Sequence, residues 1–401
     1  MSRRFLVLPV PAQGHLNPML PVATALVARG HEVTIAATES FRVAIEETGA
    51  AFVALDVELP DDPSVTAVGN GESPATRLVG MLTGIAEQVG PQLLALHAEF
   101  APDVLVLESM SLWGRLLADA TGTGTIGWSP SYLMRPESPV VQRMMRTAGG
   151  PPALGLDRMR ALAASYGADP AVLHGLLFSP VADEVVAFMP RVFHPGAVDP
   201  GATFVGPMVD RIEHDELDLG AMERTPGVYM SLGTVSDDRP DFYGAAFAAL
   251  GELGLPGVVA HSGRAELSGL EVPSGVVTAP RVPQLRVLRH SRVFVTHGGM
   301  NSTMEAAAAG VPMVVVPQTI EQEVTADRVG QLGLGVRLDP ADVTAETLAD
   351  VVRVVAEDPA YRGAAEAMAQ ECRAAGGVAV AADVMELAAT GASRALRSTA
   401  A

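Results

Sequence analysis

Short apolar runs alternate with longer stretches of helical spacing along most of the chain. RFLVLPV is an apolar run of strand length, PMLPVATALVARG has the spacing of an amphipathic helix, and HEVTIAA is a second strand-length run. This order of strand, helix and strand predicts a βαβ unit. The alternation continues with a helix over about residues 74–100 and strands at PDVLVL and GTIGWS. Strands separated by helices predict a parallel sheet that is covered on both faces.

An acidic, polar segment bounded by prolines divides the chain near its middle. The alternation restarts after it at GVYMSLG and continues through a helix over about residues 242–253 and the strands VFVT and VPMVVVP. We therefore predict an α/β protein with two doubly wound, Rossmann-like domains. The expected organisation is an N-terminal domain over 1–207, a linker over 208–226 and a C-terminal domain over 227–385.

Composition excludes several classes of function. The 401 residues carry a formal net charge of −19, which argues against nucleic-acid binding because such proteins need a basic face. The apolar runs are shorter than the ~18 residues of a membrane helix, so no membrane association is expected. Cys372 is the only cysteine, so a cytoplasmic location is expected and an intramolecular disulfide is impossible. The chain has no lysine, which excludes Schiff-base chemistry and the Walker P-loop.

Polar residues occupy the stretch THGGMNSTME, between the strand VFV and an alanine-rich helix. Two adjacent glycines allow a close approach to the backbone, and a helix start near Asn301 or Ser302 would present amide groups that attract an anion. His297 lies at the strand end, where it is able to donate to a phosphate oxygen. Ser302 and Glu305 also have the spacing of a capping box, which needs no ligand. We favour the anion site, and the capping box stays open as the alternative.

A second polar turn, AQGHLNP, follows the first predicted strand. His15 lies in this turn, beside a predicted helix for which Asn17 is the expected N-cap. The neighbouring helix N-terminus disfavours a charged imidazole, so His15 is suited to accept a proton. Glu108 closes the strand PDVLVL, and a carboxylate bonded to one ring nitrogen would fix the histidine tautomer. Taken alone, the two residues are equally explained as a loop histidine and a solvated strand-end charge.

Two weaker turns follow strands in the second half of the chain. Thr234 ends SLGT, where hydroxyl and amide groups are able to meet a phosphate. Glu321 and Gln322 follow VVVPQTI, and a carboxylate beside an amide suits sugar hydroxyls. Either turn is also compatible with an exposed loop. The sequence has no metal-ligand spacing such as HExxH, so we expect no metal site.

The longest of these patterns resembles a known family. The donor-binding signature of inverting, nucleotide-sugar-dependent glycosyltransferases is similar to RVPQLRVLRHSRVFVTHGGMNSTMEAAAAGVPMVVVPQTIEQEVTADRVGQLGLGVRL. The resemblance extends through GHLNPMLPVATALVARGHEVT, PDVLVLESMSLWGRLLA, FVGP and SLGT, and it is closest to the bacterial macrolide-type glycosyltransferases. It implies the GT-B fold, in which two Rossmann-like domains face each other across a cleft and hold the acceptor and the donor respectively. It also implies a final helix, over 386–401, that returns to the first domain.

The resemblance assigns roles to the residues that match the family's motifs. His15 matches the catalytic base, and Glu108 stands where the family usually has a supporting aspartate. Other matched positions contact the donor: His297, Gly299, Asn301, Ser302 and Thr234 its diphosphate; Glu305 its ribose; Arg281, Val282 and Gln284 its base; and Glu321 and Gln322 its sugar. Arg281 replaces an aromatic ring that stacks on the base in many relatives, and Glu321 replaces an aspartate.

The activity implied by the resemblance is inverting O-glycosyl transfer. A hexose would move from UDP-glucose, or second from a dTDP-deoxysugar, to a hydroxyl of a hydrophobic natural product such as a macrolide, polyketide or phenol. No metal or other cofactor is expected, because backbone amides, His297 and the helix start would stabilise the leaving diphosphate. Two alternatives stay open: a nucleotide-sugar epimerase of the same architecture, and a catalytically weak helper or binding protein.

Overall fold

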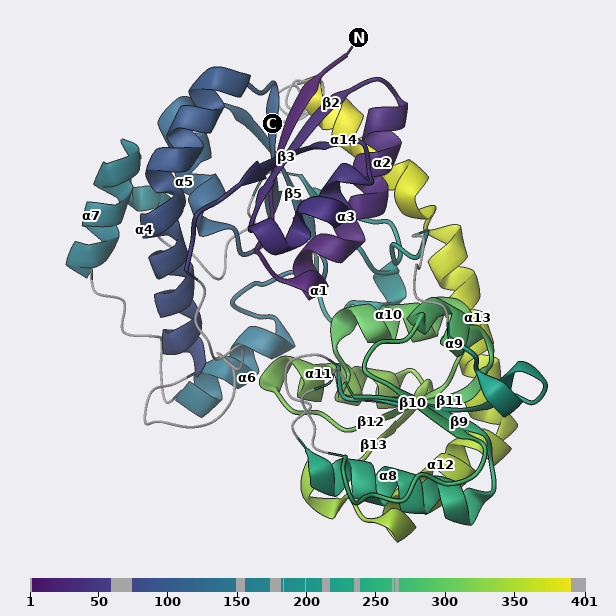
Figure 1. The fold of residues 1–401 in the computed structure, drawn as a ribbon. Helices are drawn as coiled ribbons and strands as arrows, with labels where there is room; N and C mark the ends of the chain where they lie inside the picture. The colour runs from purple at the N-terminus through teal and green to yellow at the C-terminus, as the bar shows by residue number, and fades with distance from the viewer. Residues whose placement is uncertain are drawn as a thin grey trace. The chain divides into compact units, whose positions relative to one another are not determined.

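The computed structural model consists of two compact units (Figure 1). Unit 1 contains residues 1–211 and 375–401, and unit 2 contains residues 212–374. The structure describes residues 2–58, 74–148, 156–173, 184–198, 200–210, 217–233, 239–261 and 267–390, together with 182 and 263. The boundary between the units falls inside the segment that the sequence predicts as a linker.

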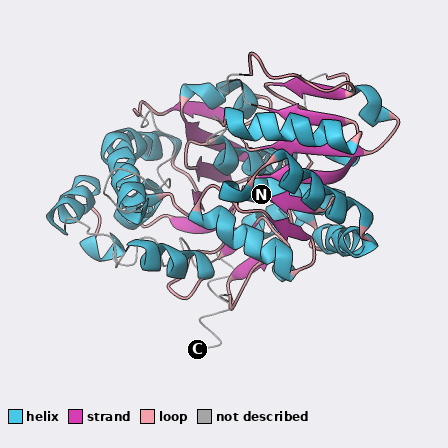
Figure 2. Cartoon of the chain, turned by 90° about the horizontal axis from the view of Figure 1, so that it is seen from below, coloured by secondary structure: helices cyan, strands magenta, loops and turns pink. Residues whose placement is uncertain are grey.

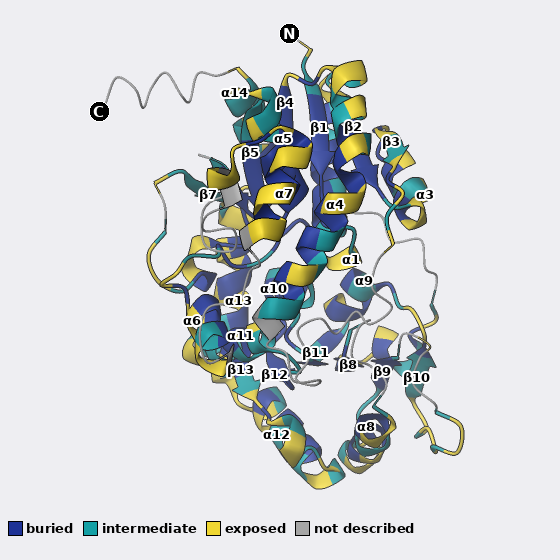
Figure 3. Cartoon of the chain, turned by 90° about the vertical axis from the view of Figure 1, so that its left-hand side faces the viewer, coloured by how far each residue is buried: buried dark blue, intermediate teal, exposed yellow. Residues whose placement is uncertain are grey.

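A seven-stranded sheet forms the centre of unit 1. Its strands run in the order β3-β2-β1-β4-β5-β6-β7, and every neighbouring pair is parallel. The strands are β1 (Arg4–Leu8), β2 (Glu32–Ala37), β3 (Ala51–Ala54), β4 (Val104–Glu108), β5 (Gly124–Ser129), β6 (Val185–Ala187) and β7 (Ala202–Phe204). The central strands β1 and β4 are buried along nearly their whole length (dark blue in Figure 3), as expected for parallel strands covered on both faces.

Helices connect the strands of unit 1. They are α1 (Gln13–Leu16), η1 (Asn17–Met19), α2 (Leu20–Ala28), η2 (Glu39–Phe41), α3 (Arg42–Glu46), α4 (Pro74–Phe100), α5 (Leu112–Thr121), α6 (Pro139–Ala148), α7 (Leu156–Tyr166), η3 (Pro170–Leu173) and η4 (Arg191–Phe193). The helix predicted over 74–100 is confirmed as α4. The predicted cap at Asn17 is wrong, because the helical chain already begins at Gln13 and Asn17 opens a 3₁₀ turn. Pro18 has no N–H to donate to a carbonyl four residues earlier, and the chain tightens there into 3₁₀ geometry.

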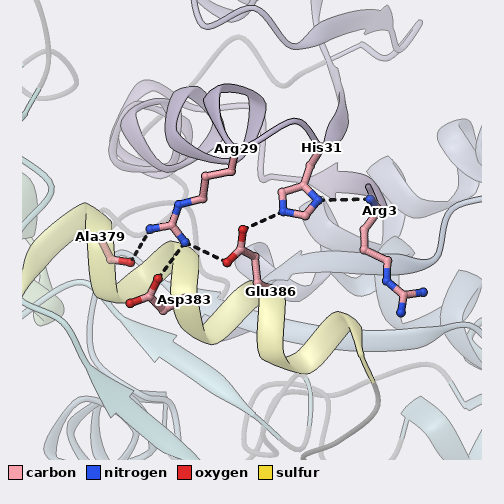
Figure 4. Close-up of polar contacts among 6 residues, drawn as sticks. All are labelled: Arg3, Arg29, His31, Ala379, Asp383 and Glu386. Atoms are coloured by element: carbon pink, nitrogen blue, oxygen red, sulfur yellow. Dashed lines mark hydrogen bonds and ion pairs between the residues drawn. The ribbon is translucent and has the colours of Figure 1, made fainter. Parts of the chain in front are cut away.

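The last described helix, α14 (Gly377–Ala389), packs on α2 within unit 1 (Figure 4). Arg29 donates to Oδ1 of Asp383 at 2.7 Å and to Oε2 of Glu386 at 2.9 Å. Nε2 of His31 lies 2.7 Å from Oε1 of Glu386, and its Nδ1 accepts from the backbone N–H of Arg3 at 3.1 Å. We call these four side chains, Arg29, His31, Asp383 and Glu386, the α2–α14 clasp.

The predicted return to the first domain at 386 is wrong, because unit 1 resumes at residue 375. The turn before α14 contains Gly376 and Gly377, whose φ angles of +90° and +58° break the helical path. The apolar side chains of α14 that follow, including Ala381 and Met385, are buried in the core of unit 1. Burial of this apolar face explains why the whole of α14, and not its last residues alone, belongs to unit 1.

A six-stranded parallel sheet forms the centre of unit 2. Its order is β10-β9-β8-β11-β12-β13. The strands are β8 (Gly227–Ser231), β9 (Gly257–Ala260), β10 (Val276–Ala279), β11 (Ser291–Thr296), β12 (Met313–Val315) and β13 (Gly335–Arg337). The sequence does not predict β13, because this short edge strand has no apolar run of strand length.

Helices border the strands of unit 2 on both faces (Figures 1 and 2). They are η5 (Gly220–Glu223), α8 (Pro240–Leu253), α9 (Gln284–Arg289), α10 (Met300–Ala309), α11 (Ile320–Gln331), η6 (Pro340–Asp342), α12 (Ala345–Glu357) and α13 (Pro359–Ala374). Helices α8 and α12 cover one face of the sheet, where Phe247, Leu250 and Val352 pack on Val228 and Val295 in one buried apolar cluster. Helices α9, α10 and α11 lie on the other face.

Both sheets share one strand order. Counted from the start of each unit, the order is 3-2-1-4-5-6, with a seventh strand added in unit 1. The direction of winding reverses between β1 and β4 in unit 1 and between β8 and β11 in unit 2. In open parallel sheets, ligands bind beyond the carboxyl ends of the strands at such a reversal.

Candidate active site

Glu108 is the last residue of β4, and His15 lies in α1, the first helix after β1; these two strands flank the reversal in unit 1. Nδ1 of His15 is 3.5 Å from Oε2 of Glu108, and the side chains are 25% and 0% exposed. This separation is longer than an ordinary hydrogen bond, and such contacts in ligand-free active sites often shorten when substrate binds. The structure therefore brings together the two residues that the sequence pairs.

The helix around His15 differs from the prediction. His15 is the third residue of a helical stretch that begins at Gln13 and continues through η1 into α2, so it lies in the first turn and does not precede the helix start. The influence of the helix N-terminus on its charge stays a prediction.

Glu108 is a fully buried carboxylate, and such a group needs hydrogen-bond donors. The hydroxyl of Ser109 donates to Oε1 at 2.5 Å, and the backbone N–H of Met110 donates to Oε2 at 3.2 Å. Burial lowers the pKa of the Arg115 guanidinium in α5 to about 10, and the negative charge of Glu108 partly opposes this effect. Sequence reasoning missed Ser109 and Arg115, although Ser109 directly follows Glu108. These contacts hold the side chain of Glu108, which is one methylene longer than the aspartate that the resemblance implies at this position.

The stretch THGGMNSTME forms the turn between β11 and α10, beside the reversal in unit 2. The N–H of Gly298 donates to Oγ1 of Thr296 at 3.2 Å, and Gly298 has a φ of +83°. A Cβ on Gly298 would lie 2.7 Å from Cγ1 of Val315, and one on Gly299 would lie 2.3 Å from Nε2 of His297. Only glycine therefore fits at both positions without a shift of its neighbours.

His297 is half-buried between two glycine backbones. One of these glycines is Gly299. The other is Gly233, which has a φ of +82°, and a Cβ on it would lie 2.6 Å from Cε1 of the His297 ring. Desolvation lowers the pKa of His297 to about 4, and the backbone of Ser231 only partly opposes this shift. The imidazole is therefore neutral at physiological pH, with one N–H donor and one nitrogen acceptor.

Helix α10 begins at Met300, with Gly299 as its N-cap. The capping-box alternative is wrong, because Ser302 lies inside the first turn and its Oγ accepts from Nε2 of Gln284 at 3.2 Å. Gly299 has no side chain with which to cap the helix, so the first-turn amides and the positive end of the helix dipole are presented at the turn. Asn301 is half-buried in the same turn.

Gln284 connects the predicted base and ribose positions. Its Nε2 donates to Oε2 of Glu305 at 2.6 Å, and its Oε1 accepts from the hydroxyl of Tyr229 at 2.8 Å. Glu305 and Tyr229 are both buried. Sequence reasoning missed Tyr229, because a tyrosine within an apolar strand has no distinguishing signal. Arg281 is exposed and Val282 is half-buried, in the segment between β10 and α9.

Glu321 and Gln322 lie in the first turn of α11, beyond the carboxyl end of β12. Oε1 of Gln322 accepts from the backbone N–H of Gln318 at 2.7 Å, and Oε1 of Gln318 accepts from Arg239 at 3.2 Å. Glu321 is exposed, and the buried hydroxyl of Thr325 donates to its backbone carbonyl at 3.1 Å. The backbone of Gln318 holds the amide oxygen of Gln322, and Arg239 holds the side chain of Gln318; neither residue is predicted from the sequence.

Thr234, the remaining predicted diphosphate contact, lies outside the described residues. Among the residues that the structure describes, no group of three or more His, Cys, Asp and Glu side chains is placed to hold a metal ion. None of the described helices combines the length and the apolarity that crossing a membrane requires.

Comparisons with known proteins cover nearly the whole chain. A family model described as "Erythromycin biosynthesis protein CIII-like, C-terminal domain" matches residues 246–387. The NDP-glycosyltransferase YjiC of Bacillus licheniformis is 32% identical over 383 residues, which cover 94% of this chain and 95% of that protein. The oleandomycin glycosyltransferase of Streptomyces antibioticus is 31% identical over 397 residues, which cover 94% of this chain and 89% of that protein.

Solved structures share the fold. The crystal structure of the glycotransferase of kitacinnamycin matches with a TM-score of 0.79 at 29% identity, over 96% of this chain and 99% of that chain. The two parallel-sheet α/β units therefore have the GT-B fold that the sequence predicts.

Proposed function

The chain belongs to the macrolide-type family of glycosyltransferases, and on this premise we propose that it is an inverting O-glycosyltransferase. It moves a hexose from a nucleoside diphosphate sugar to a hydroxyl of a hydrophobic natural product. The observation that supports this most directly is the partly exposed His15 paired with the fully buried carboxylate of Glu108 at the reversal of unit 1.

The pair supplies the base of the proposed reaction. A carboxylate only accepts hydrogen bonds, so Glu108 favours the tautomer of His15 with its proton on Nδ1 and leaves Nε2 to act as the base. The acceptor oxygen attacks the anomeric carbon as its proton passes to Nε2. The bond between that carbon and the diphosphate oxygen breaks on the opposite face, and the nucleoside diphosphate leaves. This displacement inverts the configuration at the anomeric carbon.

Unit 2 holds the donor in this proposal. The amides at the start of α10, the neutral His297, Gly299, Asn301, Ser302 and Thr234 bind the diphosphate. Preorganised N–H groups stabilise the charge that develops on the leaving group, and we propose that the reaction needs no metal. Glu305 binds the ribose, the segment from Arg281 to Gln284 borders the base, and Glu321 with Gln322 contacts the sugar.

UDP-glucose is the donor that we propose first, and a dTDP-deoxysugar is the second. Macrolides, polyketides and phenols are the proposed classes of acceptor. The matched relatives are named as glycosyltransferases, so we do not retain the epimerase alternative. We also propose a cytoplasmic location, with which the buried single thiol of Cys372 agrees.

The test begins with calorimetric binding of UDP and dTDP in the presence of EDTA. Turnover is then measured with UDP-glucose and a panel of macrolide and phenolic acceptors, and the anomeric configuration of the product is determined by NMR. We expect micromolar binding without metal and an inverted glycoside. Binding without turnover on the whole panel would favour the helper-protein alternative, and binding of neither nucleotide would overturn the donor site.

A further inference from the structure

A chain of hydrogen bonds runs from the core of unit 2 to the donor positions on α10. Tyr229 is 1% exposed, and its ring stacks on Phe294 of the neighbouring strand β11 with the ring centroids 4.5 Å apart. Its hydroxyl is 2.8 Å from Oε1 of Gln284, and Nε2 of Gln284 is 2.6 Å from Oε2 of Glu305. The same Nε2 also lies 3.2 Å from Oγ of Ser302.

Glu305, the last residue in this series, determines which group donates in each hydrogen bond. An ionised carboxylate only accepts hydrogen bonds, so Glu305 requires the amide nitrogen of Gln284. The amide oxygen is then turned towards Tyr229, whose hydroxyl must be the donor. If Gln284 were turned over, its oxygen would face the carboxylate of Glu305 and repel it. The hydroxyl of Tyr229 therefore satisfies the amide oxygen in the one orientation that serves Glu305.

We propose that Tyr229 is a positioning residue for the ribose of the donor, which acts through Gln284 on the carboxylate of Glu305. Tyr229 is too deeply buried to touch the donor itself. Ser302 and Glu305 are three residues apart on one helix, so the single amide of Gln284 orders both. The inference rests on the proposed function, because the contact between Glu305 and the ribose is part of that proposal.

Tyr229→Phe removes one hydroxyl and keeps the ring that stacks on Phe294. Calorimetry would give the Kd values of UDP and of 2′,3′-dideoxyuridine diphosphate, which has no ribose hydroxyls for Glu305 to accept from. We expect the Kd of UDP to rise about fivefold, because a buried amide oxygen loses its donor and Gln284 is no longer held. The Kd of the dideoxy nucleotide should stay unchanged. If the protein prefers dTDP, dTDP and 3′-deoxythymidine diphosphate replace the pair.

The matched control is Tyr243→Phe in α8 of the same unit. Tyr243 is also buried, but its hydroxyl lies 3.5 Å from the backbone carbonyl of Ala260, away from the donor residues. This variant should leave both Kd values unchanged. A rise of equal size for both nucleotides in Tyr229→Phe would indicate a general loss of structure and overturn the proposal, as would no rise for either.

A double variant tests the route through Gln284. Tyr229→Phe combined with Gln284→Leu should bind UDP no more weakly than Gln284→Leu alone, because the hydroxyl acts only through the amide. Additive losses would overturn that route. Failure of the unsubstituted protein to bind UDP or dTDP would overturn the proposed function, and the inference with it.

Discussion

The two sheet reversals share a topology and differ in chemistry. In unit 1, two titratable side chains lie at the reversal: Glu108 ends β4, and His15 lies in α1, the first helix after β1. In unit 2, the equivalent strands are followed by glycines that pack against a neutral histidine, His297. The comparison teaches that the strand order supplies only a location. Side chains suited to proton transfer occupy one location, and a backbone suited to an anion occupies the other.

The two reversals also differ in their local charge, which must be set against the net charge of the whole protein. The chain carries a net charge of −19, which disfavours anions at long range. A helix start acts within its first turn, and solvent ions screen distant surface charges. The turn at α10 therefore suits a diphosphate on an acidic protein, whereas the buried carboxylate of Glu108 suits a base that becomes positive during the reaction.

Replacing His15 should cause the largest loss of activity. We expect His15→Ala to lower kcat about a thousandfold, because the acceptor hydroxyl loses its base. The Kd of UDP should not change, because the proposed donor residues lie in unit 2. Steady-state kinetics and calorimetry measure the two effects. Full turnover with an un-ionised hydroxyl acceptor would remove His15 as the base.

Glu108→Gln should produce a smaller loss of the same kind. The amide keeps the shape of the side chain but no longer stabilises the positive imidazole, so we expect kcat to fall about a hundredfold. Nucleotide affinity should again be unchanged. An equal weakening of UDP binding would show that the two reversals are not separate in function, and would contradict the comparison.

Gly299→Ala should affect the other reversal. Its Cβ would lie 2.3 Å from Nε2 of His297, so either the ring or the turn must move. We expect the Kd of UDP to rise about tenfold, through the loss of one or two well-placed hydrogen bonds. The matched control is Gly330→Ala in α11, where a Cβ would meet nothing within 4 Å. That control should bind UDP normally, and weakened binding in it would argue against a steric cause.

The pH dependence of stability should reveal the burial of His297. Its pKa is about 4 in the folded protein and near 6.5 in the unfolded chain, so between these values the unfolded state binds more protons. Stability therefore falls as the pH drops from about 6.5 towards 4, and His297→Asn should remove on the order of 1 kcal/mol of that loss at pH 5. Denaturant unfolding at pH 7 and pH 5 measures the difference. Equal pH slopes in the two proteins would contradict it.

The smallest effect is expected at the α2–α14 clasp. Arg29→Ala should lower the free energy of unfolding by about 1 kcal/mol or less, because the ion pairs are partly exposed. The hydrogen bond from His31 and the charge of Arg29 lower the pKa of Glu386 from its ordinary value of 4.5. The clasp therefore contributes to stability above pH 4.5, and this contribution is lost as Glu386 protonates at lower pH. Arg42→Ala, which breaks pairs confined to η2 and α3, is the control without contacts to α14. UDP affinity should be unchanged in both, and a loss of affinity would contradict a purely structural clasp.

Local patterns predicted most of the fold. The helix over residues 74–100 and the central strands were evident because their apolar spacing continues for a whole element. β13 was missed because its three residues are too few to show a period. Asn17 was assigned as a cap because its residue type suits one, but Pro18 and the earlier helical turn determined the actual start. The resemblance implies a return of the chain at 386, whereas the glycine pair at 376–377 breaks the helical path earlier and unit 1 resumes at 375.

The candidate site was predicted where chemistry follows a strand end. Glu108 ends a strand, and His15 and His297 lie in the segments that follow one, where their residue types are unusual beside apolar runs. The residues that hold the donor-site side chains were not predictable in this way. Tyr229 contacts Gln284 55 residues along the chain, and Arg239 contacts Gln318 79 residues along, so neither contact affects local spacing. The capping box matches in sequence but is wrong, because the N-cap is Gly299 and the helix begins at Met300, before Ser302.

The course of the chain through the two units has a consequence for engineering. Unit 2 is one continuous segment, residues 212–374, inserted into unit 1. The α2–α14 clasp connects the two segments of unit 1 that flank the insertion. A chimera cut once in the linker would take Asp383 and Glu386 from one parent and Arg29 and His31 from the other. An exchange with junctions at both 211/212 and 374/375 keeps all four from one parent. Unit 2 of this protein should therefore be exchanged as a segment with two junctions.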